Sequence, residues 1–241
     1  MTPYEALYRG PRVFVRGYNG ALATSNEMVN PASLAWAAGT NFWSTATLIK
    51  VASANAADAA DGTGMRTIRV IGAGADGSVQ TEDITLNGTT AVSSTKTWKM
   101  IYAVYGLTFG TGLANAGIIY IADDGATFTS GNPATPEEAL IIPVGENAAF
   151  AANFIVPAGL SYKVKTLKVG VSTQPVVLSV YVYNATAGAW SGPVTIPVGN
   201  VGFWTVECPL GISLDAGDGI RIDALSTTAA GRVFVELELE A

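Results

Sequence analysis

Histidine is absent from the 241 residues of this chain, and Cys208 is its only cysteine. Without histidine the chain lacks the usual general base, the Ser-His and Cys-His nucleophile pairs and the commonest metal ligand. Cys208 follows a strand-like run and has no basic residue close to it in sequence, which predicts a small buried hydrophobic side chain. We therefore expect no enzyme activity, no catalytic residue, no metal ligand and no cofactor.

Charge and long apolar runs are also scarce. Charged residues make up 13% of the chain, against about 25% in an average domain. The formal net charge of −6 argues against binding to the phosphate backbone of nucleic acids. No apolar run is long enough to cross a bilayer, and the first twelve residues lack the continuous apolar core of a signal peptide. We expect no nucleic-acid partner, no membrane partner and no secretion.

The chain is instead rich in short runs of Val, Ile, Thr and aromatic residues, bounded by Gly, Asn or Asp. The stretch 64–122 is the clearest example. Within it, Thr67 and Arg69 alternate with Ile68 and Val70, which predicts a strand with one polar and one apolar face. Runs of this kind separated by turn residues indicate an antiparallel β protein.

One motif in this stretch resembles the start of a dinucleotide-binding fingerprint. Gly72, Gly74 and Gly77 stand in the spacing Gly-x-Gly-x-x-Gly directly after a predicted strand. That chemistry needs a following helix to hold the pyrophosphate and an acidic residue about 20 positions further on. The residues at 79–86 predict a second strand, and no acidic residue lies between Asp83 and Asp123. The glycines therefore indicate a hairpin turn.

The pattern predicts an all-β chain of two antiparallel β-sandwich or jelly-roll-like domains, preceded by an irregular N-terminal arm. The arm covers residues 1–44, the first β domain 45–126, a Gly- and Pro-rich linker 127–138, and the second, jelly-roll-like sandwich 139–241. In the last strand, Glu236 and Glu238 share one face. Because nothing marks an apolar pocket around either carboxylate, they indicate edge protection by charge rather than a pair of glycosidase acids.

Residues 1–44 combine aromatic side chains and arginines with many Gly and Pro residues. Such a segment has no core of its own, so we expect it to dock, either on its own domain or on a neighbouring subunit. Tyr and Arg are favoured at interfaces. The candidate interface residues are Tyr4, Tyr8, Arg9, Arg12, Phe14, Arg16, Tyr18, Trp36 and Trp43.

Two groups of acidic residues invite comparison with cation sites. Asp58 and Asp61 lack the alternating acids and closing Glu of a calcium loop, so a solvated turn is the better interpretation. Asp215, Asp218 and Asp223 lie near the penultimate predicted strand, where acidic side chains are common at turns. We weigh a cation site there as the minor alternative.

Four phrases of the sequence resemble a recurrent tailed-bacteriophage virion structural protein. They are Asp-Gly-Thr-Gly-Met-Arg-Thr-Ile-Arg-Val-Ile-Gly at 61–72, Glu-Asp-Ile-Thr-Leu-Asn-Gly-Thr-Thr-Ala-Val at 82–92, Ile-Ile-Pro-Val-Gly-Glu-Asn-Ala-Ala-Phe at 141–150, and Phe-Ile-Val-Pro-Ala-Gly at 154–159. The resemblance implies a capsid decoration (cement) protein, a head fibre or a tail-associated subunit. It also implies a homotrimer that contacts the major capsid protein or another virion protein, in a virion assembled in the host cytoplasm. It carries over no catalytic residue.

The alternative is a carbohydrate-binding module for adsorption to a host glycan. Tyr181, Tyr183, Trp190 and Trp204 are the aromatic residues considered for stacking on sugars. Aromatic residues in strands also serve as core or subunit contacts. Binding to a glycan array would favour adsorption, whereas tight binding to empty capsids would favour decoration.

Overall fold

The structure is a computed structural model that describes residues 8, 10–22, 27–28, 42–134, 138–172, 175–199, 202–207, 211–226 and 231–241. These residues form β-strands, turns and loops, so the expected all-β class is confirmed. The chain divides into two units. The terminal unit contains Met1–Ala35, Asp76–Val79 and Ala151–Ala241, and the central unit contains Trp36–Ala75 and Gln80–Phe150.

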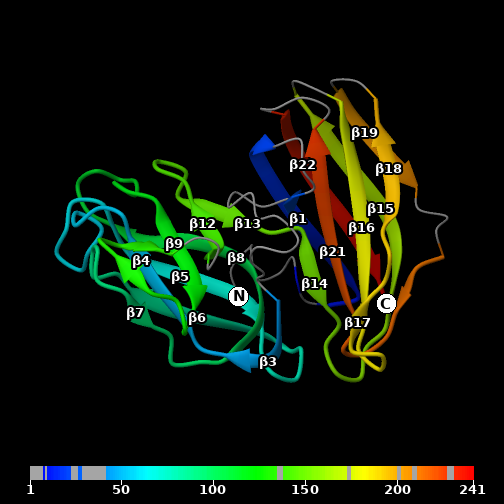
Figure 1. Ribbon diagram of the computed structural model, residues 1–241, viewed down its shortest axis with the longest axis horizontal. Coiled ribbons are helices and arrows are strands. Elements are labelled where there is room, and N and C mark those ends of the chain that lie inside the picture. The colour runs from blue at the N-terminus through cyan, green and yellow to red at the C-terminus, as the bar shows by residue number, and fades with distance from the viewer. Residues whose placement is uncertain are drawn as a thin grey trace. The chain divides into compact units, whose positions relative to one another are not determined.

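The central unit contains two larger antiparallel sheets (Figure 1). In the first, the strand order is β13 (Ala148–Phe150), β8 (Trp98–Phe109), β5 (Met65–Ala73) and β6 (Val79–Thr85), and β3 (Phe42–Thr47) also pairs with β8. In the second, the order is β12 (Glu138–Ile142), β9 (Ile119–Asp123), β4 (Ile49–Ser53) and β7 (Val92–Ser93). A small hairpin joins β10 (Phe128–Thr129) to β11 (Asn132–Pro133). Fully buried side chains such as Ile68, Trp98 and Ile121 form the core.

The glycine motif lies at the turn between β5 and β6. Because a strand follows the glycines, the hairpin interpretation is confirmed and the helix needed for a pyrophosphate is missing from this position. Gly77 has a φ of 77°, which a residue without Cβ adopts readily. A Cβ at Gly72 would lie 2.2 Å from the carbonyl oxygen of Met100 on β8, so this glycine allows close strand packing.

Asp58 is a buried carboxylate that joins three parts of the central unit. Its Oδ1 accepts hydrogen bonds from the backbone N–H of Met65 at 2.8 Å and of Ala116 at 2.9 Å. Its Oδ2 accepts from the Ser53 hydroxyl at 2.6 Å and from the Gly117 N–H at 2.8 Å. The predicted solvated turn is therefore wrong at Asp58, because this carboxylate satisfies buried donors that β-strands leave unpaired at their ends. Asp61 is exposed.

The terminal unit also has two antiparallel sheets, seen as layers of strands in Figure 1. We call the first the β22 sheet. Its order is β1 (Arg12–Leu22), β22 (Gly231–Glu240), β15 (Tyr162–Val171) and β19 (Gly202–Glu207), and β20 (Ser213–Leu214) also pairs with β15. The second, the β16 sheet, has the order β14 (Asn153–Ile155), β21 (Gly219–Ser226), β16 (Val176–Asn184) and β17 (Ala189–Trp190). In it β18 (Val194–Val198) pairs with β16, and β2 (Glu27–Met28) pairs with β21.

Apolar residues at alternate positions of both sheets form the core of the terminal unit. On β22 the buried apolar side chains are Val233, Val235, Leu237 and Leu239, as the alternation of the sequence predicts. The rings of Phe154 on β14 and Tyr162 on β15 meet edge to face, with centroids 5.8 Å apart. This contact joins the two sheets across the core.

The prediction of an irregular arm is wrong for residues 12–22, which form the longest edge strand of the β22 sheet. The pairing of β1 with β22 runs from Arg12 opposite Glu240 to Asn19 opposite Val233, and a register shift precedes Leu22. Val13 and Val15 of β1 are fully buried. The β22 strand needs a neighbour for its backbone groups and its apolar face, and β1 supplies both. Docking on the chain's own domain is therefore the observed outcome for this segment.

The boundary between the units also differs from the prediction. It falls between Phe150 and Ala151, rather than in the expected linker at 127–138. Leu140 and Ile142 of β12 are buried, and this strand pairs with β9, while β13 pairs with β8. The first strands assigned to the second domain thus complete the sheets of the central unit.

Candidate functional site

The most unusual surface among the described residues is the outer face of the β22 sheet. We define this face by the side chains that alternate with the buried ones: Arg12, Phe14 and Arg16 on β1; Arg232, Phe234, Glu236, Glu238 and Glu240 on β22; Lys168 and Gly170 on β15; and Phe203 and Thr205 on β19. The strand register arranges them in rows. One row contains Phe234, Gly170 and Phe203, and the next contains Arg16, Glu236, Lys168 and Thr205.

Ion pairs neutralise the charged rows of this face. Glu236 accepts hydrogen bonds from Arg16 Nε at 2.7 Å and from Lys168 Nζ at 2.8 Å. Glu240 pairs with Lys165 at 2.7 Å, and Arg12 lies between Glu238 and Glu240. Burial raises the pKa of the Glu236 carboxyl, but the hydrogen bonds from Lys168 and Arg16 outweigh it and bring the pKa below its ordinary value.

This geometry gives the row of glutamates a structural role. A glycosidase acid needs a pKa above its usual range, whereas the pKa of Glu236 and that of Glu240 are lowered. The expectation of edge protection is also wrong, because β22 lies between β1 and β15. The carboxylates bind cations on both neighbouring strands, so they align β1, β22 and β15.

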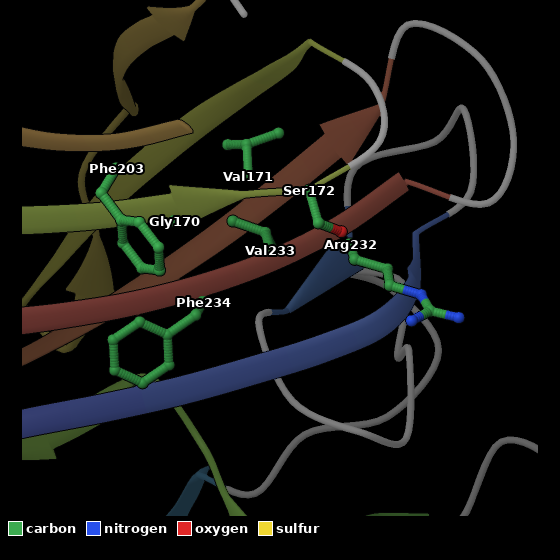
Figure 2. A pocket seen from close by; sticks show the side chains of 7 residues that line it. All are labelled: Gly170, Val171, Ser172, Phe203, Arg232, Val233 and Phe234. Atoms are coloured by element: carbon green, nitrogen blue, oxygen red, sulfur yellow. The ribbon is translucent and has the colours of Figure 1, made fainter. Parts of the chain in front are cut away.

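Beyond the charged rows, the face is hollowed beside its aromatic row (Figure 2). The hollow has a volume of about 280 Å³ and is lined by Gly170, Val171, Ser172, Phe203, Arg232, Val233 and Phe234. In Figure 2 the two phenyl rings gather at one end, and Ser172 and Arg232 lie at the other. The hollow therefore combines an aromatic end with a polar, cationic end.

The missing side chain of Gly170 shapes this hollow. A Cβ at Gly170 would lie 2.7 Å from Cε1 of Phe203, so the phenyl ring occupies the space that a side chain on β15 would fill. Phe203 is nevertheless 88% exposed, and Phe234 is 36% exposed. Trp204, the next residue on β19, is 45% exposed but lies on the other face of the sheet, because it pairs with the buried Val169. An exposed cluster of large aromatic residues is typical of a surface that binds a partner or ligand.

Arg232 differs from the other described arginines. The guanidinium groups of Arg12, Arg16, Arg69 and Arg221 pair with carboxylates, and that of Arg66 donates to the carbonyl of Gly62. The Arg232 side chain is exposed and forms no hydrogen bond or ion pair with the described part of the chain. A cation without a partner among the described residues, beside an aromatic hollow, is available for an anionic group.

The structure describes six of the nine candidate interface residues of the predicted arm. Tyr4, Arg9 and Trp36 lie outside the described residues. Tyr8 is buried, and burial raises the pKa of its hydroxyl. Arg12, Phe14, Arg16 and Tyr18 lie on β1, where Arg16 and Arg12 are engaged by glutamates of β22. Trp43 lies on β3 of the central unit and is half-buried.

The structure separates the acidic residues considered for a cation. Asp218 accepts hydrogen bonds from the backbone N–H of Ala185 and of Asp215, and so stabilises a turn. Asp223 is buried and receives Arg221 Nε at 2.5 Å and Nη2 at 2.9 Å. Desolvation raises the pKa of Asp223, with partial compensation by Arg221. Among the described residues no group of three acidic, histidine or cysteine side chains is placed to hold a metal ion.

Cys208 lies outside the described residues, so its expected burial stays a prediction. In the part of the chain that the structure covers, no helix has the length and apolarity to cross a membrane.

The aromatic residues first considered for sugar stacking lie mainly on the other sheet. Tyr183 on β16 and Trp190 on β17 form a cross-strand pair with ring centroids 5.4 Å apart. Trp204 lies on β19 and is not among the residues that line the hollow. Phe203, Phe234 and Arg232 were not identified from the sequence. The adjacent aromatic residues Phe203 and Trp204 on a predicted strand were the sequence feature that could have indicated this site.

Comparison with known proteins leaves the family open. No family model matches the chain, and no curated protein matches it. The solved stem and receptor-binding domain of the spike protein P1 from bacteriophage PM2 resembles it at 10% identity and a TM-score of 0.20, with 97% of each chain covered. A likeness at this TM-score carries no argument about the fold or the function of this chain.

Proposed function

We propose that this chain is a non-enzymatic structural subunit of a bacteriophage particle, of the capsid decoration (cement) or fibre type. The subunit associates with further copies of itself, as a trimer, and with the major capsid protein or another virion protein. The sequence phrases that resemble phage virion proteins support this proposal. Three of the four, at 61–72, 82–92 and 141–150, coincide with strands and turns of the central unit.

The observation that carries the proposal is the outer face of the β22 sheet. The carboxylates of Glu236, Glu238 and Glu240 on this face are paired within the chain, while Phe203 and Phe234 remain exposed. A surface with neutralised charge and exposed aromatic rings loses little by desolvation and gains from apolar burial when a partner covers it.

The attachment surface we propose differs from the one expected from the sequence. Arg12 and Arg16 hold β1 against β22 and are therefore poor candidates for contacts with another protein. Attachment through the exposed aromatic row and the neighbouring β19 strand fits the structure better. The residues 1–7 and 29–41 lie outside the described ones, and their part in attachment stays a prediction.

The test is direct localisation of the subunit. Purified particles of the phage that encodes this chain are probed by electron microscopy with the chain labelled, and the purified chain is measured by native mass spectrometry. We expect label on the particle surface and a trimer in solution. A chain that stays monomeric at high micromolar concentration and is missing from purified particles would contradict the proposal.

A second function, adsorption to a host glycan, is favoured by one observation. The hollow beside the aromatic row, at about 280 Å³, lies just below the range of small-ligand sites, which begins at roughly 300 Å³. Attachment and adsorption would both use Phe203 and Phe234, so a subunit whose aromatic row is covered in the particle cannot also bind a glycan there.

A further inference from the structure

The hollow of the β22 sheet joins three chemical features that no other described surface of the chain combines. Two phenyl rings, those of Phe203 and Phe234, lie at one end, and the uncommitted guanidinium of Arg232 lies at the other with the Ser172 hydroxyl. Backbone groups hold this arrangement, because the N–H of Ser172 donates to the carbonyl of Arg232 at 3.2 Å. The site is thus built on the paired ends of β15 and β22.

We propose that this hollow binds an acidic saccharide, with a sugar ring on the phenyl rings and a sugar carboxylate on Arg232. The inference rests on the second of the proposed functions, adsorption to a host glycan, and it requires that the aromatic row stays uncovered in the particle. The apolar C–H face of a pyranose packs on an aromatic ring by burial and dispersion. A carboxylate accepts two parallel hydrogen bonds from a guanidinium, which gives the charged end its specificity.

The charge distribution favours an anionic ligand over a neutral one. The chain has a net charge of −6, yet the ionic groups next to the hollow are paired, with Glu236 held by Arg16 and Lys168. Arg232 is therefore the charge that an approaching ligand meets at this end of the sheet. A carboxylated sugar replaces the water around Arg232 with a matched partner, whereas a neutral sugar leaves the guanidinium without one.

The volume of the hollow limits the ligand that it can hold. At about 280 Å³ it is near the lower end for small-molecule sites. This space suits one or two sugar residues of a longer chain, with the remainder in solvent. Phe203 lies on the edge strand β19, so a polysaccharide can enter from the side of the sheet.

The experiment measures binding of the full chain to an array of carboxylated, sulfated, phosphorylated and neutral saccharides. The best carboxylated saccharide is then titrated in solution beside its carboxyl-reduced form. Variants Phe203→Ala and Arg232→Gln change the two ends of the hollow. Two variants outside the hollow are the matched controls. Lys163→Gln removes an exposed cation of β15, and Leu113→Ala truncates an exposed leucine of the central unit.

We expect each hollow variant to weaken binding about tenfold or more, as removal of a charged hydrogen bond or a stacked ring does, while the controls bind like the original chain. Carboxyl reduction of the saccharide should weaken binding to the original chain but have little effect on Arg232→Gln. The proposal is overturned if no carboxylated saccharide binds, or if both hollow variants bind normally.

Particle incorporation and native mass are measured for the same variants, so that failure of the ligand site and failure of the structural role are distinguishable. Normal incorporation with lost saccharide binding supports the proposal. If Phe203→Ala instead dissociates the oligomer, the hollow is a contact between copies of the chain and the saccharide proposal is wrong.

Discussion

At the residue scale, Asp58 is the side chain on which the loops of the central unit most depend. It accepts four hydrogen bonds, three of them from backbone N–H groups of Met65, Ala116 and Gly117. Asp58→Ala leaves these donors buried without an acceptor, so we expect the free energy of unfolding to fall by about 3–5 kcal/mol. Chemical denaturation measures the change. Asp61→Ala, at an exposed position, is the control and should change stability by less than about 0.5 kcal/mol; equal effects would contradict this role for Asp58.

Glu236 gives the terminal unit a predictable response to acid. Its pKa in the folded chain lies below the ordinary value of 4.5 because Lys168 and Arg16 bind the charged form. The unfolded state therefore binds more protons between those two pKa values, and stability is lost as the pH falls through that window. Glu236→Gln removes this contribution. Unfolding measured at pH 7 and pH 3 should show a smaller acid-induced loss in the variant than in the original chain, and an unchanged loss would contradict the assignment.

At the element scale, β1 is the strand whose role could not be predicted from the sequence. Its partner β22 lies about 220 residues away, and Gly17 and Gly20 interrupt its alternation. We expect deletion of residues 1–22 to expose the edge of β22 and cause aggregation.

Val15→Ala should lower the free energy of unfolding by about 1–3 kcal/mol, since this valine is fully buried. Arg12→Ala, at an exposed ion pair, should cost less than about 1 kcal/mol. If the variant that lacks residues 1–22 is soluble and melts like the original chain, β1 is dispensable for the fold and this role is wrong.

Other elements were predictable because their information is local. The alternation of Ile68 and Val70 with Thr67 and Arg69 gave β5, and the absence of a helical period after Gly77 gave the hairpin to β6. The binding hollow was not predictable. Phe203, Gly170 and Phe234 come from three strands, and only the register of those strands brings the rings to either side of one glycine. Charge pairing had the same limit, since Arg16 and Glu236 meet only after β1 joins the sheet.

At the scale of the whole molecule, the chain divides into two units at a position that its Gly- and Pro-rich stretches do not indicate. The Gly- and Pro-rich stretch at 127–138 resembles a linker, yet it contains the β10–β11 hairpin and leads into β12. Strands β12 and β13 then complete the two sheets of the central unit before the chain enters the terminal unit. The Gly and Pro content therefore predicted a surface loop correctly. The boundary between the units lies further along the chain, because Leu140 and Ile142 pair with β9 of the central unit.

This difference can be tested with fragments of the central unit. A fragment of residues 36–150 retains every strand of its two larger sheets, with Leu140 and Ile142 in place. A fragment of residues 45–126, the domain expected from the sequence, lacks β12 and β13, loses the first half of β3 (Phe42–Thr47), and exposes the edges of β9 and β8. Strand edges and uncovered apolar side chains promote aggregation. We expect the longer fragment to be soluble, with a β-type circular dichroism spectrum and a cooperative thermal transition, and the shorter one to be insoluble or to lack such a transition. If the shorter fragment melts as cooperatively as the longer one, β12 and β13 contribute little to this unit and the boundary belongs nearer to residue 127.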